Sequence, residues 1–233
     1  GIENNKILRE MLMITDKFEI KDFDSFIIGN SYGIKQCWYK EKGTLIHHLA
    51  YREGCGYVSI LNMYLYLKYK STGKKHTKLE IIEKMNKIYM YNLNLRIGIN
   101  SIYFLKKVAI KFLRKEKEEK SFSFEVLSKK TGINNNYKEA KELIIKSLEA
   151  ENPVAILINH RVSDKILKKN FKYHWITITG IRTEDKKTYL TASNWGEKWE
   201  YLNFEEIWND SHNVLDRIFA SGLVVMKEQE KPK

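Results

Sequence analysis

Apolar residues recur at helical spacing through the first part of the chain. Three stretches show this pattern, at residues 56–69, 79–91 and 101–118. Apolar residues three and four positions apart share one face of a helix, so each stretch predicts a helix that is buried against the core. Residues 1–136 are therefore expected to be mainly helical.

The pattern changes after residue 136. A helix is expected first, because Asn136 and Glu139 have the spacing of a capping box ahead of an apolar stripe. Short runs rich in β-branched and aromatic residues then predict strands. These runs lie at 153–158, 175–181, 188–192 and 222–226, and a short helix is expected at 204–208. Residues 137–233 are therefore expected to form a mainly antiparallel sheet.

Together the two parts predict a single α+β domain that spans residues 1–233. No internal repeat and no linker rich in Pro or Gly divides the chain. A helical half that packs on a sheet half leaves a cleft along their junction, where active sites commonly lie. Residues 1–30 are expected to form an N-terminal extension that occludes this cleft.

The charge of the chain raises the question of its partners. The formal net charge is +12, which would favour nucleic acid if the cations formed a patch. The lysines instead alternate with apolar residues at helical spacing, which is typical of solvated helix faces. We therefore expect no nucleic-acid partner, and an acidic or polyanionic partner is the alternative explanation of the charge.

The sequence lacks the features of membrane, metal and disulfide-rich proteins. No run of about eighteen apolar residues is present, and the first residues do not resemble a signal peptide. We expect a soluble protein with no membrane span and favour the cytoplasm, although a chain that begins with Gly leaves its original compartment open. Two cysteines are too few for a disulfide framework, and no His or Cys pair has zinc-ligand spacing. We expect no metal and no cofactor.

Cys55 has the clearest chemical context in the chain. It lies between Gly54 and Gly56 and directly precedes an apolar stretch, so it is expected at a helix N-terminus. The helix dipole and the unpaired backbone N–H groups at such a position lower the pKa of a thiol and favour the reactive thiolate. The alternative is a buried cysteine that only packs, as most free cysteines do.

Among the histidines, His174 is the best candidate for a base. It opens the run His-Trp-Ile-Thr-Ile-Thr-Gly, which places it at the start of a strand, where a rigid backbone suits a general base. The alternative is a strand-end histidine that bonds to the backbone. The other histidines are His160, the main competitor, then His47 and His48, with His76 and His212 expected at the surface.

Asn194 is the candidate for the group that orients the base. It follows a predicted strand in the segment Ser193-Asn194-Trp195-Gly196. An acceptor at this position would fix the tautomer and the orientation of an imidazole, and Trp195 would shield the hydrogen bond from water. The alternative is turn chemistry, because Asn and Gly commonly end a strand.

These segments together resemble the papain-like cysteine peptidases. The resemblance rests on Gly54-Cys55-Gly56 before an apolar helix, Asn152-Pro153-Val154 entering a strand, His174-Trp175 opening a β run, and Asn194-Trp195-Gly196. Within that superfamily the chain is most similar, over residues 54–226, to the bacterial group that includes the double-glycine leader peptidases. The Asn-Trp-Gly segment is closer to papain than to the leader peptidases, which have Asp in this role.

The resemblance implies a papain-like fold and a thioester mechanism. Cys55 would attack the carbonyl of a peptide or isopeptide bond, His174 would protonate the leaving group, and Asn194 would complete the triad. The family usually has Gln six residues before the nucleophile as an oxyanion donor, and this chain has Leu49 there. Such a donor can contribute about 3 kcal/mol. The remaining side-chain candidates for this role are His48 and Gln36.

Three functions are compatible with these residues. The first is a cysteine peptidase that hydrolyses a peptide or protein substrate. The second is a thiol acyltransferase or transglutaminase-like enzyme, which would pass the same thioester to an amine. The third is an inactive papain-like binding module. Leu49 suggests this alternative, because position 49 lacks the Gln that would donate a hydrogen bond to an oxyanion.

Overall fold

The computed structural model describes residues 14–42, 45–93, 98–158, 174–209 and 221–229. Its main sheet has seven strands: β1 (Ile14–Glu19), β4 (Phe122–Ser128), β5 (Val154–Ile158), β6 (His174–Glu184), β7 (Lys187–Asn194), β8 (Glu197–Asn203) and β9 (Gly222–Glu228). The order across the sheet is β4-β9-β5-β6-β7-β8, and β1 pairs with the C-terminal end of β6. Every strand pair described in this sheet is antiparallel. A small hairpin, β2 (Ile27–Ile28) and β3 (Ser31–Tyr32), forms a second sheet.

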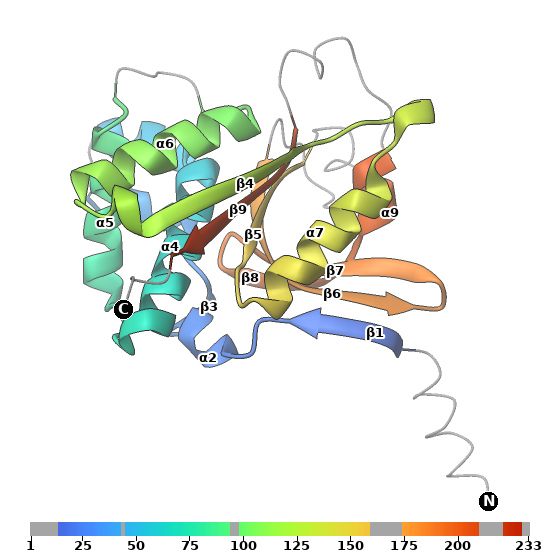
Figure 1. Ribbon diagram of the computed structural model, residues 1–233. Coiled ribbons are helices and arrows are strands. Elements are labelled where there is room, and N and C mark those ends of the chain that lie inside the picture. Colours follow the sequence, from blue (N-terminus) through green and yellow to red (C-terminus); the bar gives the residue numbers. More distant parts are fainter. Residues whose placement is uncertain (1–13, 43–44, 94–97, 159–173, 210–220, 230–233) are drawn as a thin grey trace, which may run out of the picture.

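Helices cover both faces of the main sheet (Figure 1). The α-helices are α2 (Phe23–Phe26), α3 (Leu45–Glu53), α4 (Cys55–Thr72), α5 (Lys78–Met90), α6 (Ile102–Lys115), α7 (Tyr137–Glu149) and α9 (Phe204–Asn209). Three 3₁₀ helices are η1 (Gln36–Lys42), η2 (Glu119–Ser121) and η3 (Gly132–Asn134). Helices α4 and α6 pack on one face of the sheet, with α5 against α4 on the same side, and α7 and α9 pack on the other face.

The side chains of β5 show how the sheet divides the core. Val154 and Ile156 belong to the apolar cluster on the side of α7, whereas Ala155 and Leu157 belong to the cluster on the side of α4. Successive residues of a strand point to opposite faces, and here both faces are covered by helices. This is why β5 is a continuous apolar run rather than an alternating one.

The strongly periodic elements form where the sequence predicts them. The helices expected at 56–69, 79–91 and 101–118 are α4, α5 and α6. The strands expected after residue 136 are β5, β6, β7 and β9, and the short helix expected at 204–208 is α9. The mixed helical and antiparallel α+β character is therefore confirmed.

The capping box predicted at Asn136 is wrong. Asn136 is the N-cap residue of α7, but its side chain makes no hydrogen bond to the first turn. Its Oδ1 instead accepts from the backbone N–H of Lys130 at 2.8 Å and from Nε1 of Trp208 at 3.1 Å. Its Nδ2 donates to the carbonyl oxygen of Ser128 at 2.9 Å. The amide therefore joins β4, α7 and α9, and these tertiary hydrogen bonds replace the local cap.

The expected division into a helical half and a sheet half does not correspond to separate layers. Strand β4 lies in the first part of the chain and forms one edge of the sheet, next to β9. Helix α7 lies in the second part and packs against β5 and β6. The strands β1, β4 and β8 were not predicted. In β4, Phe122, Phe124 and Val126 alternate with polar residues, which is the pattern of a half-buried strand, whereas β1 and β8 have fewer apolar residues.

Strand β1, in the segment 1–30 that was expected to occlude the cleft, does not reach the triad candidates. Strand β1 pairs with residues 180–184 of β6, at the opposite end of that strand from His174. Residues 1–13 lie outside the described ranges. Within the described ranges, no helix has both the length and the apolar character that crossing a bilayer requires.

Candidate active site

Cys55 is the first residue of α4, as predicted. The chain enters this helix from α3 through Gly54, whose carbonyl oxygen accepts the backbone N–H of Val58 at 2.9 Å. A Cβ atom on Gly54 would lie 2.4 Å from the carbonyl oxygen of Ala50 and 2.6 Å from Cε2 of Tyr39. A residue with a side chain would therefore displace the turn that presents Cys55.

Gly56, on the other side of Cys55, is equally constrained. A Cβ atom there would lie 2.8 Å from Cβ of Ile99. The carbonyl oxygen of Ile99 in turn accepts a hydrogen bond of 2.7 Å from Nε1 of Trp175, the residue that follows His174. Close packing at Gly56 thus ties the start of α4 to the start of β6.

The pKa of the Cys55 thiol differs in direction from the sequence-based expectation. Burial raises this pKa above its ordinary value, and the backbone N–H groups of Trp175 and Gly56, which donate toward the sulfur, lower it by less. The helix N-terminus therefore does not produce a depressed thiol pKa in the resting protein. The expectation is wrong because it considered the helix dipole and not the removal of the sulfur from water.

His174 is the first residue of β6, and its side chain is buried. Burial lowers the pKa of the imidazole to about 4, and the hydrogen bond to Asn194 acts in the opposite direction. The ring is therefore neutral at neutral pH, which is the form that accepts a proton. The hydrogen bond from the backbone N–H of Trp175 places the Cys55 sulfur next to the first residues of the same strand.

Asn194 is the last residue of β7 and is 1% exposed. Its Oδ1 lies 2.6 Å from Nε2 of His174. An amide oxygen only accepts, so Nε2 carries the proton of the neutral ring and Nδ1 has the lone pair. This is the tautomer in which Nδ1 can act as a base toward the thiol.

The second polar atom of Asn194 explains why this side chain is unusual. Its Nδ2 is buried and has no hydrogen-bond partner among the described residues. A buried, unsatisfied N–H costs about 1–3 kcal/mol. Asn194 is therefore a poor choice for stability alone, and its hydrogen bond to His174 is the feature that accounts for it.

Trp195 and Gly196 form the two-residue connection between β7 and β8. Both have a positive φ, of 53° and 79°, as in the type I′ turns that suit the twist of a hairpin. Both alternatives for this segment therefore hold together: it is a turn, and it positions Asn194. The ring of Trp195 lies 4.8 Å from that of His174, between centroids, as expected for a side chain that shields the hydrogen bond.

The two side-chain candidates for the oxyanion donor, Gln36 and His48, differ in burial. Gln36 opens η1 and is buried, and its Nε2 donates to the carbonyl oxygen of Tyr51 in the last turns of α3. His48 and Leu49 lie on α3 and are exposed. The side chain of Gln36 therefore reaches the segment that leads into Cys55, although the two residues are distant in sequence.

The other described histidines lie outside the elements that carry the triad candidates. His47 lies on α3 and His76 precedes α5, and both are partly buried. His160, the main competitor of His174, lies outside the described residues, as does His212. Neither Cys37 nor Cys55 forms a disulfide, and Cys37 is exposed. In the described part of the chain, no three His, Cys, Asp or Glu side chains come together as metal ligands would.

No family model and no curated protein matches this chain significantly. A thiol at the start of a helix, a neutral imidazole with a fixed tautomer, and a buried amide that holds it are together suited to proton transfer from sulfur to nitrogen.

Asn62 was not identified from the sequence, and Ser193 was identified only as part of the segment that follows a predicted strand. The ring of Tyr39 packs against Gly54, and the side chains of Asn62 and Ser193 form hydrogen bonds close to the triad candidates. Each lies in an ordinary sequence context, and only the partners that the fold supplies distinguish them.

Proposed function

We propose that this protein is a papain-like cysteine hydrolase that cleaves a peptide or isopeptide bond. Cys55 is assigned as the nucleophile, His174 as the general base and acid, and Asn194 as the residue that orients His174. The observation that carries the proposal is the buried hydrogen bond of 2.6 Å between Nε2 of His174 and Oδ1 of Asn194. It fixes the imidazole beside the strand residue whose N–H contacts the thiol.

The proposed reaction starts from a neutral thiol and a neutral imidazole. As Sγ of Cys55 attacks the substrate carbonyl, Nδ1 of His174 accepts the thiol proton. The imidazolium then gives this proton to the leaving amine, and a thioester remains on Cys55. Water, deprotonated by His174, attacks the thioester and releases the acid, which restores the thiol.

The oxyanion that forms on the substrate needs hydrogen-bond donors. The backbone N–H of Cys55 lies at the helix N-terminus and is one candidate. For the second donor we favour Gln36 over His48, because Gln36 is buried and its amide reaches Tyr51 next to the turn at Gly54. An amide nitrogen carries two hydrogens, and the bond to Tyr51 uses one of them.

The first test is the alkylation of Cys55 by iodoacetamide at pH 7, followed by mass spectrometry. Because burial raises the pKa of this thiol, its reaction at neutral pH depends on proton transfer to His174. We expect His174→Ala to slow the reaction on the order of 10²-fold, the usual contribution of a general base. Exposed Cys37 is the internal standard, and Cys55→Ala identifies its signal. Equal rates in the wild type and His174→Ala would refute the proposal.

The oxyanion assignment is tested separately with a cleaved peptide. Gln36→Ala is expected to lower kcat on the order of 10²-fold, whereas His48→Ala is expected to leave kcat unchanged. A loss of kcat in His48→Ala alone would transfer the role to His48. Product analysis with and without an added amine distinguishes hydrolysis from acyl transfer.

The inactive binding module is the second candidate, and two observations favour it. Position 49 holds an exposed Leu instead of a donor, and the pKa of the Cys55 thiol is raised rather than lowered. This candidate predicts no thioester with any peptide and no effect of His174→Ala on alkylation.

A further inference from the structure

The segment 31–34 lies between the elements that carry the triad candidates. The backbone N–H of Tyr32 donates to the carbonyl oxygen of Gly196 at 2.8 Å, and Oγ of Ser193 donates to the carbonyl oxygen of Tyr32 at 2.6 Å. Oγ of Ser31 donates to the carbonyl oxygen of Gly33 at 2.7 Å. The segment is thus fixed to the residues on both sides of Asn194 and Trp195.

Asn62 joins this segment to α4 and β6. Its Oδ1 accepts from the backbone N–H of Ile34 at 3.0 Å, and its Nδ2 donates to Oγ1 of Thr177 at 3.2 Å. Asn62 lies seven residues after Cys55 in α4, which places both on the same face of the helix. Thr177 is paired with Ser193 across β6 and β7. One buried amide therefore connects the helix of Cys55 with the strands of His174 and Asn194.

The segment approaches these side chains too closely for any residue but glycine at position 33. A Cβ atom on Gly33 would lie 2.5 Å from Oγ of Ser193 and 3.0 Å from Oδ1 of Asn62, and its φ is +77°. Residues 31–34 therefore pass between α4 and β7 in close contact with the polar side chains of Asn62 and Ser193.

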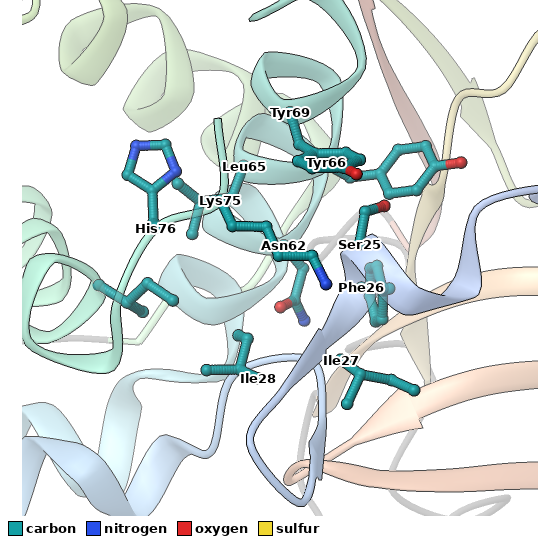
Figure 2. A pocket seen from close by; sticks show the side chains of 11 residues that line it. Ser25, Phe26, Ile27, Ile28, Asn62, Leu65, Tyr66, Tyr69, Lys75 and His76 are labelled. Carbon is teal, nitrogen blue, oxygen red and sulfur yellow. The ribbon is translucent and has the colours of Figure 1, made fainter. Parts of the chain in front are cut away.

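Packing alone does not hold the amide of Asn62. A cavity of about 40 Å³ lies beside it, and Phe26, Ile28, Leu65 and His76 are among the side chains that line this cavity (Figure 2). The apolar contacts of α4 with the sheet are not directional, and they resist shifts along the helix axis through shape alone. The hydrogen bonds of Asn62 do have a direction, and they oppose such shifts.

We propose that Asn62 is a positioning residue that fixes the register of the Cys55 helix against the His174 strand. The inference rests on the proposed function, because register matters only if the thiol and the imidazole exchange a proton. Displacement of one reacting group by about 1 Å can cost on the order of 10²-fold in rate. A residue with a purely structural role would affect stability without affecting this proton transfer.

The test measures how many-fold His174→Ala slows the alkylation of Cys55. This ratio of rates is determined once in the wild-type background and once in the Asn62→Ala background. We expect Asn62→Ala to lower this ratio by about tenfold, through loss of alignment. Asn62→Asp, which can still accept from Ile34 and bond to Thr177, is expected to restore most of it. Asn92→Ala, which removes another buried amide that bonds to Ile88, is the control for stability and should leave the ratio unchanged.

Thr177→Val replaces the hydroxyl group with a methyl group and serves as a second variant if Asn62→Ala does not fold. It should also lower the ratio. If the wild type shows a large ratio and both variants keep it, the positioning role is wrong and the proposed function stands. If the wild-type ratio is one, the proposed function fails, and the positioning role fails with it.

Discussion

Nε2 of His174 lies 2.6 Å from Oδ1 of Asn194, and both side chains are buried at the adjoining ends of β6 and β7. The two residues come from neighbouring strands, so the rigid sheet holds the distance between them. Because the amide oxygen accepts, the bond selects one tautomer of the imidazole. Several measurable properties depend on this single contact.

Asn194→Ala is expected to separate activity from stability. Without the amide oxygen, the imidazole loses its orientation, and kcat should fall on the order of 10²-fold. The free energy of unfolding should change by less than about 1 kcal/mol, because the variant also removes an unsatisfied buried N–H. Peptide hydrolysis and urea denaturation measure the two effects. A large loss of stability with unchanged kcat would show that Asn194 is structural.

The pH dependence of kcat/KM is expected to have an acid limb near 4. His174 must be neutral to accept the thiol proton, and burial lowers its pKa to about 4. Activity should therefore rise as the pH increases through this value, rather than through the ordinary value of about 6.5. In Asn194→Asp, the negative charge stabilises the imidazolium, so the limb should move to higher pH. An unmoved limb would mean that a different group titrates.

The free energy of unfolding is expected to decrease as the pH is lowered through the range in which His174 binds a proton. Its pKa is about 4 in the folded state and 6.5 for the free group, so the unfolded chain binds the proton first. The contribution of His174 to the free energy of unfolding is therefore complete above pH 6.5. As the pH falls toward 4, this contribution decreases by roughly 3 kcal/mol. Urea denaturation of the wild type and His174→Gln across this range checks the value, because the variant lacks the titration. Parallel curves for the two proteins would contradict the assignment.

Gly54→Ala is expected to disturb the turn before Cys55. The added Cβ would lie 2.4 Å from the carbonyl oxygen of Ala50 and 2.6 Å from the ring of Tyr39. Overpacking of this kind costs about 1–3 kcal/mol, and displacement of the turn should also slow the alkylation of Cys55. Gly98→Ala is the matched control, because its Cβ would meet Glu53 at an ordinary distance of 3.6 Å. Similar thermal stabilities of the two variants would argue against a constrained turn.

Much of the architecture could be predicted from the sequence. The helices α4, α5 and α6 and the strands β5, β6, β7 and β9 follow from local periodicity, since apolar spacing determines which face of an element is buried. The placement of Cys55 at a helix N-terminus and of His174 at the start of a strand follows from the same local patterns. Strands β1, β4 and β8 were not predicted. Strands β1 and β4 pair with strands that are distant in sequence, whereas β8 pairs with the adjacent strand β7 in a hairpin. In all three, the pairing stabilises the strand more than its own composition does.

The same distinction between local pattern and tertiary contact holds for the candidate site residues. The sequence by itself determined which residue types stand at the ends of which elements, and this was enough to select Cys55, His174 and Asn194. Only the tertiary structure decided that Asn194 bonds to His174, that Gln36 reaches Tyr51, and that the pKa of the thiol is raised. Hydrogen bonds and desolvation depend on which groups the fold brings together and on how much water it removes, and neither is encoded in local spacing.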